Sequence, residues 1–438
     1  MAKPNSNSPT ALGANDRVAI VAGVRTPFAR AWTAFKHWNE ADLGRAVANE
    51  LLNRVDIDPE LIDELIFGCV SAPMDGPNVG REIVLRSQLP KHIPASTVQM
   101  YCASSAYAAV QGINALLLGT SEVVIAGGVE SMSSARARFS LGLSHALQDV
   151  SRARNLQDRL KALSQIKAGD LLPEQPAIEE PTTGKSMGES AEDMAKLYGI
   201  GRQEQDAYAE LTHHRAAAAY ESGAFPEVMP VLHGENFDQV IERDNNLRAD
   251  TTVERMARLK PVFDRRHGTV TAANASPLTD GASAVLLMRE SRAKKLGLTP
   301  MAFVRSYAQV GIDIQRHNLL LGPTLATPIA FERAGVSLND MDLVEMHEAF
   351  AAQVLANIKI WKDKDLCQGL GLDEAIGEVN MDTFNVHGGS VALGHPFGAT
   401  GTRLITQLAG ELQRRDKNLG LLTMCAAGGL GLSMVLER

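Results

Sequence analysis

The stretch VQMYCASSAYAAVQGINALLLGTSEVVIAGG, residues 98 to 128, decides the fold of this chain. Cys102 follows a short apolar run and opens a long run of small and apolar residues, and no charged residue occurs between Ile93 and Ser121. This pattern predicts a strand, a tight turn at the cysteine, a buried helix and a second strand, which is one unit of a parallel or mixed sheet covered by helices. Taken alone, a buried cysteine usually packs as a small hydrophobe.

The C-terminal third is expected to repeat this plan. Residues 343–361 have the pattern of a strand and a helix, residues 384–415 that of a glycine-rich loop and a helix, and residues 419–438 that of two strands around a glycine turn. AGGVES at 126–131 and AGGLGL at 427–432 each follow a predicted strand that is preceded by a helix of small residues. The recurrence suggests that the chain contains two duplicated halves.

Upstream of the cysteine, the pattern predicts a strand, a helix and a strand over residues 16–27, 41–55 and 63–70. A charged, turn-rich segment separates the two halves and is expected to be an inserted domain. The predicted organisation is a tail at 1–15, a first half at 16–135 and 261–298, an inserted domain at 136–260 and a second half at 299–438.

Composition excludes several classes of protein. The chain has 438 residues, of which 45% are hydrophobic and 21% charged, as in a globular protein of two or three domains. A net charge of -8 argues against a general nucleic-acid binder. The 4 cysteines are scattered and form no CxxC pair, which argues against a disulfide framework or a structural zinc and favours a reduced, cytoplasmic compartment.

No targeting or membrane segment is expected. Residues 1–15 lack the apolar core of a signal peptide and the Arg-rich character of a transit peptide. The uncharged stretch at 93–121 is interrupted by glutamine, serine, asparagine and glycine, so a buried helix is favoured over a transmembrane one.

Two motifs fail on inspection. TTGKS at 182–186 has Glu179 where a phosphate-binding loop needs its first glycine. MHEAF at 346–350 is followed by Ala351 where a zinc protease needs its second histidine. We therefore expect neither a nucleotide-binding loop nor a metal site.

Three residues on strand-end turns are candidates for chemistry. Cys102 precedes a helix, whose positive N-terminal end and free N–H groups favour a thiolate and can hold a developing oxyanion. His395 lies in a stiff loop between Gly394 and Pro396, where it can act as a base, and Cys425 ends a buried strand just before a glycine turn.

These features occur with other motifs in an order that resembles the thiolase family. The resemblance runs from about Arg17 to the C-terminus. The motifs are RTPFAR at 25–30, the turn at Cys102, GGVESMS at 127–133, NASPLTDGASA at 274–284, HEAF at 347–350, GGSVALGHPFGATG at 388–401 and CAAGGLG at 425–431.

The resemblance implies an α/β thiolase fold with two duplicated five-layered α-β-α-β-α halves and an inserted loop domain. It also implies an acyltransferase that cleaves 3-ketoacyl-CoA with CoA to acetyl-CoA and a shortened acyl-CoA, or runs the reverse condensation. Cys102 would form the acyl-thioester, His395 would activate it, and Cys425 would exchange the α-proton. The backbone N–H groups of Cys102 and Ala427 would hold the oxyanion of the tetrahedral intermediate.

One departure from the commoner family pattern is His347, where many thiolases have asparagine. The resemblance implies that His347 contributes to the oxyanion hole for the thioester oxygen of the acetyl unit, either through a water or directly. The histidine form and the segment 151–177 resemble the β-oxidation subgroup that partners a hydratase–dehydrogenase subunit. The residues implied to contact substrate or CoA are Met187, Arg248, Ser276, Ala349 and Phe350.

The resemblance further implies that CoA is a substrate, that no cofactor is needed, and that the protein is a homodimer or homotetramer. A biosynthetic acetoacetyl-CoA thiolase remains an alternative. A non-catalytic acyl-CoA carrier of this fold is disfavoured because no catalytic residue is missing, and a decarboxylating ketoacyl synthase is disfavoured by the intact CAAGG motif. Acyl chain length and physiological direction stay open.

Overall fold

The computed structural model describes residues 15–136, 139–172, 179–234 and 236–438, so nearly all of the predicted tail lies outside it. The chain divides into two compact units. The smaller unit is Ala135–Met187, and the larger one joins the residues up to Ser134 with Gly188–Arg438. The smaller unit therefore covers only the first part of the segment predicted as an insertion, and residues 188–260 belong to the larger unit.

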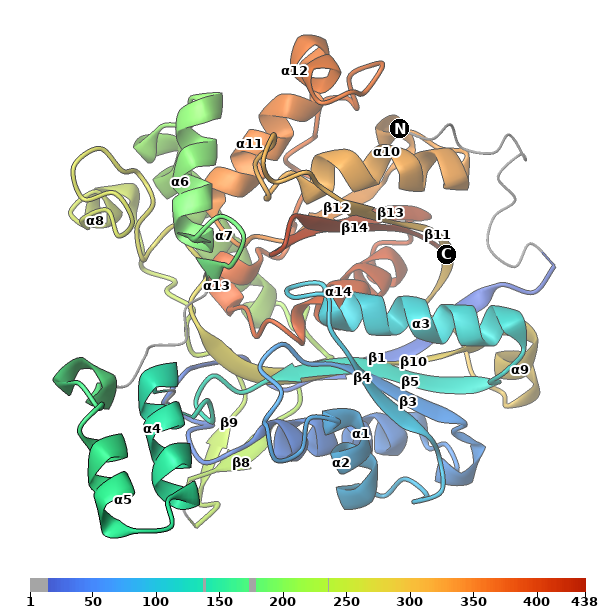
Figure 1. The fold of residues 1–438 in the computed structure, drawn as a ribbon. Coiled ribbons are helices and arrows are strands. Elements are labelled where there is room, and N and C mark those ends of the chain that lie inside the picture. Colours follow the sequence, from blue (N-terminus) through green and yellow to red (C-terminus); the bar gives the residue numbers. More distant parts are fainter. Residues whose placement is uncertain (1–14, 137–138, 173–178, 235) are drawn as a thin grey trace. The chain divides into compact units, whose positions relative to one another are not determined.

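The larger unit is built on a sheet to which both halves contribute (Figure 1). The strands lie in the order β12 (Leu343–Met346), β13 (Leu419–Ala426), β14 (Leu430–Glu437), β11 (Ala302–Gly311), β1 (Val18–Arg25), β10 (Thr279–Arg289), β5 (Val123–Glu130), β3 (Glu64–Gly68) and β4 (Ala95–Val98). The halves meet where β1 pairs antiparallel with β11, with Val18 opposite Val304.

The two halves have the same strand pattern, which confirms the predicted duplication. In the first half, β3 runs parallel to β5, and β5, β10 and β1 follow as antiparallel neighbours. In the second half, β12 runs parallel to β13, and β13, β14 and β11 follow in the same way. A helix precedes each of the two corresponding strands, α3 (Ser104–Leu118) before β5 and α14 (Thr400–Arg414) before β13.

Helices cover both faces of each half's strands (Figure 1). One core lies between the first-half strands and the outer helices α1 (Glu40–Val55) and α2 (Val79–Arg86). A second core surrounds α3 and α14, which lie between the strands of the two halves. A third packs α10 (Gly322–Ala334) and α11 (Ala351–Trp361) on the second-half strands.

The layers of the larger unit are therefore shared between the halves. We expected five layers in each half, but each half supplies one set of strands and one outer layer of helices, and both contribute to the central helices. The reason lies in α3, which has no charged side chain and so gains from apolar neighbours on both sides.

Residues 98–128, around Cys102, fold as predicted. The strand β4, the turn, the helix α3 and the strand β5 follow one another, and every residue of β5 is buried. The helix ends at Gly119, whose φ of 73° is a left-handed cap that glycine adopts without strain.

The two Ala-Gly-Gly sequences differ in structure, which corrects the expectation that each follows its strand. Residues 126–128 lie within β5, where Gly127 and Gly128 let neighbouring segments approach the backbone closely. Gly428 and Gly429 form the turn after β13, with φ values of 75° and 67°. A strand interior beside a crowded core and a tight turn both favour glycine, for different reasons.

The smaller unit contains two amphipathic helices, α4 (Leu141–Arg152) and α5 (Leu156–Leu163), which pack together, and a short hairpin. Ser140 and Asn155 cap the two helices through their side-chain oxygens. The hairpin strands are β6 (Glu179–Glu180) and β7 (Lys185–Ser186), and the 3-10 turn before them is Ala168–Leu171.

The remaining elements of the larger unit connect the layers. They are β2 (Ala29–Arg30), α6 (Met187–Tyr198, whose first residue belongs to the smaller unit), α7 (Arg202–Glu221), β8 (Val231–His233), β9 (Gln239–Ile241), α8 (Val253–Met256), α9 (Glu290–Lys295), α12 (Lys364–Gly369), α13 (Ser390–Leu393) and the 3-10 turns Pro59–Leu61 and Leu338–Asp340. Within the described ranges, none of the helices has both the length and the apolar character needed to cross a membrane.

Candidate active site

Cys102 lies in the turn between β4 and α3, and its backbone is held in an unusual conformation. Tyr101, just before it, has a φ of 46°, which is left-handed and uncommon for a residue with a side chain. Ser104 locks the turn, because its hydroxyl accepts from the Met100 N–H at 2.9 Å and donates to the Tyr101 carbonyl at 2.6 Å. A strained turn that its surroundings hold in place is typical of functional sites.

Two backbone N–H groups stabilise the thiolate form of Cys102, those of Ala427 and of Cys102 itself. Burial has the larger effect and raises the pKa of the thiol to about 11. The N–H groups act in the direction predicted for the helix N-terminus, but desolvation outweighs them in the resting protein. The resting group is a neutral thiol.

Cys425 is a second free thiol, near Cys102. It lies near the end of β13 and is buried, and both burial and the negative charge of an ionised Cys102 raise its pKa. The turn at Gly428 passes the ring of Tyr101, and a side chain at this position would lie 3.1 Å from the ring. The turn after β13 and the turn before α3 thus pack against each other.

His347 and His395 form a pair of buried imidazoles, with ring centroids 4.2 Å apart. His347 follows β12 directly, and His395 lies in the loop between α13 and α14. Among the described residues, neither Nε2 atom has a hydrogen-bond partner. Burial lowers the pKa of His395 to about 3, with help from the positive charge of Arg403, and burial, His395 and Arg403 lower the pKa of His347. Both rings are neutral near pH 7.

Each ring is oriented through its Nδ1 atom by a hydroxyl. The Nδ1 of His395 lies 2.6 Å from the Thr400 Oγ1, and the Nδ1 of His347 lies 3.1 Å from the Ser390 Oγ. The backbone N–H of His395 also donates to the Thr279 hydroxyl at 2.8 Å. The free Nε2 atoms are therefore the ones available to a substrate.

Close backbone approaches join the imidazole loop to the nucleophile turn. Added Cβ atoms at Gly401, in the first turn of α14, and at Gly128, in β5, would collide with Ala106 of α3 and with the Gly398 carbonyl, respectively. The Thr402 N–H donates to the Ser105 hydroxyl at 3.0 Å. The start of α14 therefore packs directly on the first turn of α3, just after Cys102.

Two buried carboxylates support this arrangement. Glu130, at the end of β5, accepts from the N–H groups of Gly398 at 2.9 Å and of Ser71 at 2.8 Å, which ties the His395 loop to the segment after β3. Burial raises its pKa to about 7. Glu348, next to His347, accepts from the Tyr208 hydroxyl at 2.8 Å and from three other donors.

The predicted CoA contacts fall in different places. Arg248 is exposed and lines a cavity of about 400 Å³ together with Arg30 and Arg255. Ser276 is half-buried, and its N–H donates to the Ala349 carbonyl at 3.0 Å, while Phe350 forms a bridge with Ala275. Met187 is the last residue of the smaller unit, whereas the other predicted contacts belong to the larger unit.

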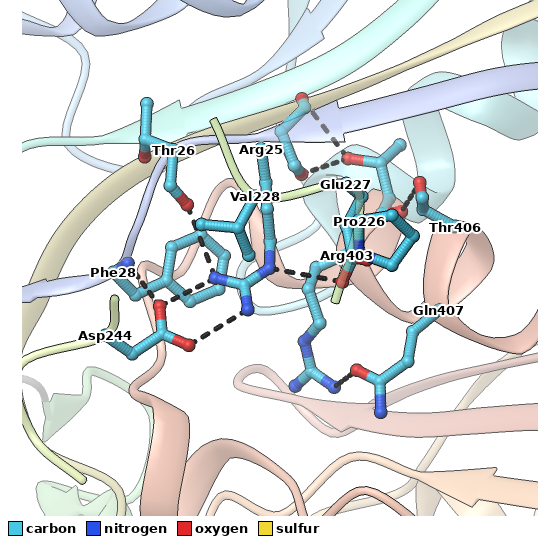
Figure 2. A network of polar contacts seen from close by, with 12 residues as sticks. Arg25, Thr26, Phe28, Pro226, Glu227, Val228, Asp244, Arg403, Thr406 and Gln407 are labelled. Carbon is cyan, nitrogen blue, oxygen red and sulfur yellow. Dashed lines mark hydrogen bonds and ion pairs between the residues drawn. The ribbon is translucent and has the colours of Figure 1, made fainter. Parts of the chain in front are cut away.

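The first family motif contributes a buried arginine. Arg25 forms a two-bonded ion pair with Asp244, at 2.6 and 2.9 Å, and its Nε lies 3.6 Å from Glu227 (Figure 2). These contacts tie β1 to the segment that follows β9, which is a structural role. Arg403 lies in the same region and donates to the Gln407 side-chain oxygen at 3.3 Å (Figure 2) and to the Ser390 hydroxyl at 2.7 Å.

Sequence reasoning missed four polar residues of the site. Ser390, Thr400 and Arg403 lie in or beside the motif GGSVALGHPFGATG, from which only His395 was selected, and Glu348 stands next to His347. Their presence inside these motifs was the available signal. What each one contacts depends on tertiary packing.

Comparisons with known proteins agree with this geometry. Residues 18–291 match the thiolase N-terminal domain and residues 298–438 the thiolase C-terminal domain. The chain is 49% identical to a 3-ketoacyl-CoA thiolase of Yersinia enterocolitica over 438 residues, covering 100% of both chains. It is 50% identical to a 3-ketoacyl-CoA thiolase of Pectobacterium carotovorum over 423 residues, covering 96% of this chain and 97% of that protein.

Solved structures show the same fold. An acetyl-CoA acetyltransferase of Bacillus anthracis superposes with a TM-score of 0.83 at 32% identity, over 98% of this chain and 99% of that one. Human mitochondrial 3-ketoacyl-CoA thiolase in complex with CoA superposes with a TM-score of 0.82 at 32% identity, over 98% of this chain and 100% of that one. The predicted thiolase fold is thereby confirmed, and the chain belongs to the thiolase family.

Proposed function

We propose that this protein is an acyltransferase that cleaves 3-ketoacyl-CoA with CoA, giving acetyl-CoA and a shortened acyl-CoA through a thioester on Cys102. One observation carries the proposal. A half-buried thiol with backbone N–H groups on its sulfur lies near a second free thiol. The helix that follows the His395 loop packs on the first turn after Cys102, and His395 and His347 form a pair of imidazoles with free Nε2 atoms among the described residues. The relatives at 49% and 50% identity bear the name of this activity.

In the first half-reaction, the Cys102 sulfur attacks the β-keto carbon and its proton passes to Nε2 of His395. The N–H groups of Cys102 and Ala427 hold the resulting oxyanion. When the bond between the α and β carbons breaks, its electron pair forms the enolate of acetyl-CoA. His347, together with His395, binds the enolate oxygen, and Cys425 donates the proton that completes acetyl-CoA.

In the second half-reaction, the thiol of CoA attacks the acyl group on Cys102 after losing its proton to Cys425. The same N–H pair holds the tetrahedral oxyanion. Collapse releases acyl-CoA and leaves the Cys102 thiolate, which takes back a proton from His395. Because one thiol carries the acyl group while the other moves protons, the reaction needs two cysteines.

We further propose that the cavity at Arg248 takes the phosphates of CoA, since Arg30, Arg248 and Arg255 line it and Asp250, paired with Arg255, offsets only one of these charges. Ser276, Met187, Ala349 and Phe350 stay predictions for the pantetheine and acyl portions. CoA is a substrate in this scheme, and the prediction that no cofactor or metal is required follows from the chemistry assigned to the four catalytic residues.

The test is trapping of the covalent intermediate. Incubation with an acyl-CoA should add one acyl mass to the wild type, at the peptide that contains Cys102, and none to Cys102→Ala. The wild type should also consume 3-ketoacyl-CoA in the presence of CoA. An acylated Cys102→Ala protein, or a wild type without thiolysis, would remove the assignment.

The alternative, a biosynthetic acetoacetyl-CoA thiolase, draws support from the Bacillus anthracis acetyl-CoA acetyltransferase of the same fold. That structure is 32% identical to this chain, as is human mitochondrial 3-ketoacyl-CoA thiolase, whereas the 3-ketoacyl-CoA thiolases of Yersinia enterocolitica and Pectobacterium carotovorum are 49% and 50% identical. The higher identity favours the first assignment.

We also propose a homodimer or homotetramer in the cytoplasm, able to bind a hydratase–dehydrogenase subunit. The strand β4 supports self-association, because it ends the order of the sheet and its four residues are half-buried. Such an edge is a template for pairing with a second chain. Size-exclusion chromatography with light scattering tests the assembly.

A further inference from the structure

The two imidazoles of the site each face one hydroxyl group, but the two hydroxyl groups direct their hydrogen atoms differently. Each Nδ1 faces one hydroxyl, and each Nε2 is free among the described residues. A neutral imidazole carries one hydrogen, so the hydroxyl at Nδ1 decides whether Nε2 is a donor or an acceptor.

At His347 the hydroxyl is already committed as an acceptor. Ser390 is fully buried, and its Oγ lies 2.7 Å from Nη2 of Arg403. A guanidinium can only donate, so the Ser390 oxygen accepts this bond. The hydroxyl has no other acceptor among the described residues, so its hydrogen points to the Nδ1 of His347, 3.1 Å away. Its Nδ1 is therefore the acceptor, and the hydrogen of the ring is on Nε2.

At His395 the direction is reversed. The hydroxyl of Thr400 donates to the Pro396 carbonyl at 3.0 Å, so its oxygen accepts from the Nδ1–H of His395 at 2.6 Å. The Nε2 of His395 then carries a lone pair, which suits a base that takes the Cys102 proton. The two neighbouring rings thus present one donor and one acceptor.

The buried charge of Arg403 strengthens this arrangement. Arg403 is fully buried, its Nε has no partner among the described residues, and its only other bond is to Gln407 (Figure 2). Burial lowers its pKa to about 10, so it remains a cation near pH 7. Its charge lowers the pKa of both histidines, which keeps the rings neutral.

We propose that Ser390 and Arg403 are positioning residues, which together hold His347 as an Nε2–H donor aimed at the enolate oxygen of acetyl-CoA. The inference rests on the proposed function for the identity of the oxygen, and on the hydrogen bonds alone for the tautomer. Neither residue touches substrate in this scheme; both act through His347.

The tautomer can be tested without any activity. In protein labelled with [15N]histidine, the His347 resonances are assigned by their loss in His347→Asn. We expect a pyrrole-type Nε2 and a pyridine-type Nδ1 in the wild type, and a mixture of tautomers in Ser390→Ala. A wild-type His347 that carries its hydrogen on Nδ1 would overturn the proposal, whether or not the protein is a thiolase.

The kinetic test separates positioning from folding. Ser390→Ala should lower thiolysis, and the exchange of acetyl-CoA methyl protons with deuterium, by about 10- to 100-fold, because one well-placed donor is lost. Acylation of Cys102 by acyl-CoA, which needs no enolate, should change less than threefold (about 0.6 kcal/mol). Ser306→Ala, which removes an equally buried hydroxyl that donates to the Ala330 carbonyl, is the control and should leave kcat unchanged.

A double-mutant cycle tests whether Ser390 acts through His347. His347→Asn should reduce thiolysis by about 10-fold, since asparagine restores a donor at a different reach. In the His347→Asn protein, Ser390→Ala should lower the rate of thiolysis less than twofold, because no imidazole remains to be oriented at position 347. An equal loss in both backgrounds, or an equal loss of acylation and proton exchange, would assign Ser390 a purely structural role and contradict the proposal. Loss of wild-type acylation would instead count against the proposed function.

Discussion

Cys425 and Cys102 differ in accessibility, although both are neutral thiols in the resting protein. Cys102 is half-buried in its turn, while Cys425 is buried near the end of β13, where an ionised Cys102 would raise its pKa further. Only one of the two thiols can therefore ionise readily at a time. This asymmetry matches a division between a covalent role and a proton-transfer role.

The division predicts the behaviour of Cys425→Ala. The variant should still accept an acyl group on Cys102 from acyl-CoA, because the nucleophile, the imidazoles and the N–H groups remain. It should lose the exchange of acetyl-CoA methyl protons with deuterium by at least about 100-fold, the usual range for a missing acid–base group. Mass spectrometry and proton NMR measure the two effects. Exchange at the wild-type rate would remove Cys425 from the mechanism.

The buried His395 predicts a pH-dependent stability. Its pKa is about 3 in the folded protein and about 6.5 in an unfolded chain, so the unfolded state binds more protons between these values. The stabilisation from His395 is therefore fully present above pH 6.5 and is lost as the pH falls toward 3.

Urea unfolding at pH 7, 6 and 5 measures this dependence. The free energy of unfolding of His395→Asn should fall less steeply with decreasing pH than that of the wild type. His37→Asn, at an exposed position, is the control and should follow the wild type. Parallel curves for His395→Asn and the wild type would show that His395 binds protons equally in the folded and unfolded states, so that folding does not lower its pKa.

Among the residues of the site, the sequence predicts only those that stand in a distinctive local sequence pattern. Cys102, His395 and Cys425 stand out because each follows a strand or precedes a helix beside glycine. Ser390, Thr400 and Arg403 have no such signature, since a serine, a threonine or an arginine near a helix start is ordinary. Their partners come from the residue after β12, from α13, from α14 and from the loop before α14, and these meet only in the folded chain.

The helices α3 and α14 approach so closely at their first turns that glycine is required. A Cβ at Gly401 would collide with the backbone of Ala106, whereas a Cβ at Gly410, in the same helix, would lie 3.5 Å from the flexible end of Met301. The first position has no room and the second has ordinary van der Waals space. One helix thus offers a matched pair of substitutions.

Gly401→Ala should therefore destabilise the protein by about 1–3 kcal/mol or more, through overpacking against α3. Gly410→Ala should stabilise it by about 0.5–1 kcal/mol, because alanine is the better helix former. Urea unfolding at a fixed protein concentration gives both values. Because α14 also positions Thr400 and Arg403, Gly401→Ala should in addition lower thiolysis. A stability equal to that of the wild type would show that α3 can move away without cost.

The elements themselves were predicted well where hydrophobic patterns are long. The predicted helix at 41–55 is α1 (Glu40–Val55), and the predicted strand at 63–70 is β3 (Glu64–Gly68). The prediction was wrong at Gly127 and Gly128, which lie inside β5. The letters Ala-Gly-Gly carry no sign of whether glycine serves a turn or a close contact, since the contact lies on other segments, such as Gly398 and Phe67.

Composition predicts one boundary of the inserted segment but not the other. Composition changes near residue 136, close to the boundary of the smaller unit at Ala135. It does not change at 188, because α7 is also rich in polar residues. Several of these are nevertheless buried in the larger unit, where Tyr208 and Thr212 bond to Glu348. Buried polar residues with internal partners cannot be told from solvated ones by composition.

The smaller unit carries a concentration of positive charge in a protein of net charge -8. Within residues 151–167 the exposed basic residues are Arg152, Arg154, Arg159, Lys161 and Lys167. Such a cluster attracts anionic CoA thioesters or an acidic partner at a distance, and salt screens this attraction. A local field of this kind acts on association rather than on the chemical step.

Reversal of Arg152, Arg159 and Lys161 to glutamate should therefore raise the KM for 3-ketoacyl-CoA, or weaken binding of a hydratase–dehydrogenase subunit, by about 3- to 10-fold at low salt. The effect should shrink at 0.5 M salt, and kcat should not change. Lys294→Glu with Lys295→Glu, on α9, is the control. Equal effects of the two charge reversals would show that only the net charge of the protein matters.

The last prediction concerns the acyl chain. The sequence resemblance of His347 and of the segment 151–177 to the β-oxidation subgroup implies substrates that are longer than acetoacetyl-CoA. On the exposed surface of α5, Leu156, Leu160 and Leu163 recur at helical spacing, so this unit offers an apolar face for a chain or a partner. We therefore expect C8 to C16 substrates to be cleaved with a higher kcat/KM than acetoacetyl-CoA.

Initial rates of thiolysis over a C4 to C16 series, at fixed CoA and salt, measure this preference. Each added methylene that enters an apolar environment should favour binding by about 0.8 kcal/mol, which is close to a fourfold gain in kcat/KM until the site is filled. The same series with Leu156→Ser and Leu160→Ser shows whether these two leucines affect the chain-length preference. A strict preference for the C4 substrate would instead contradict the degradative assignment and favour the biosynthetic acetoacetyl-CoA thiolase.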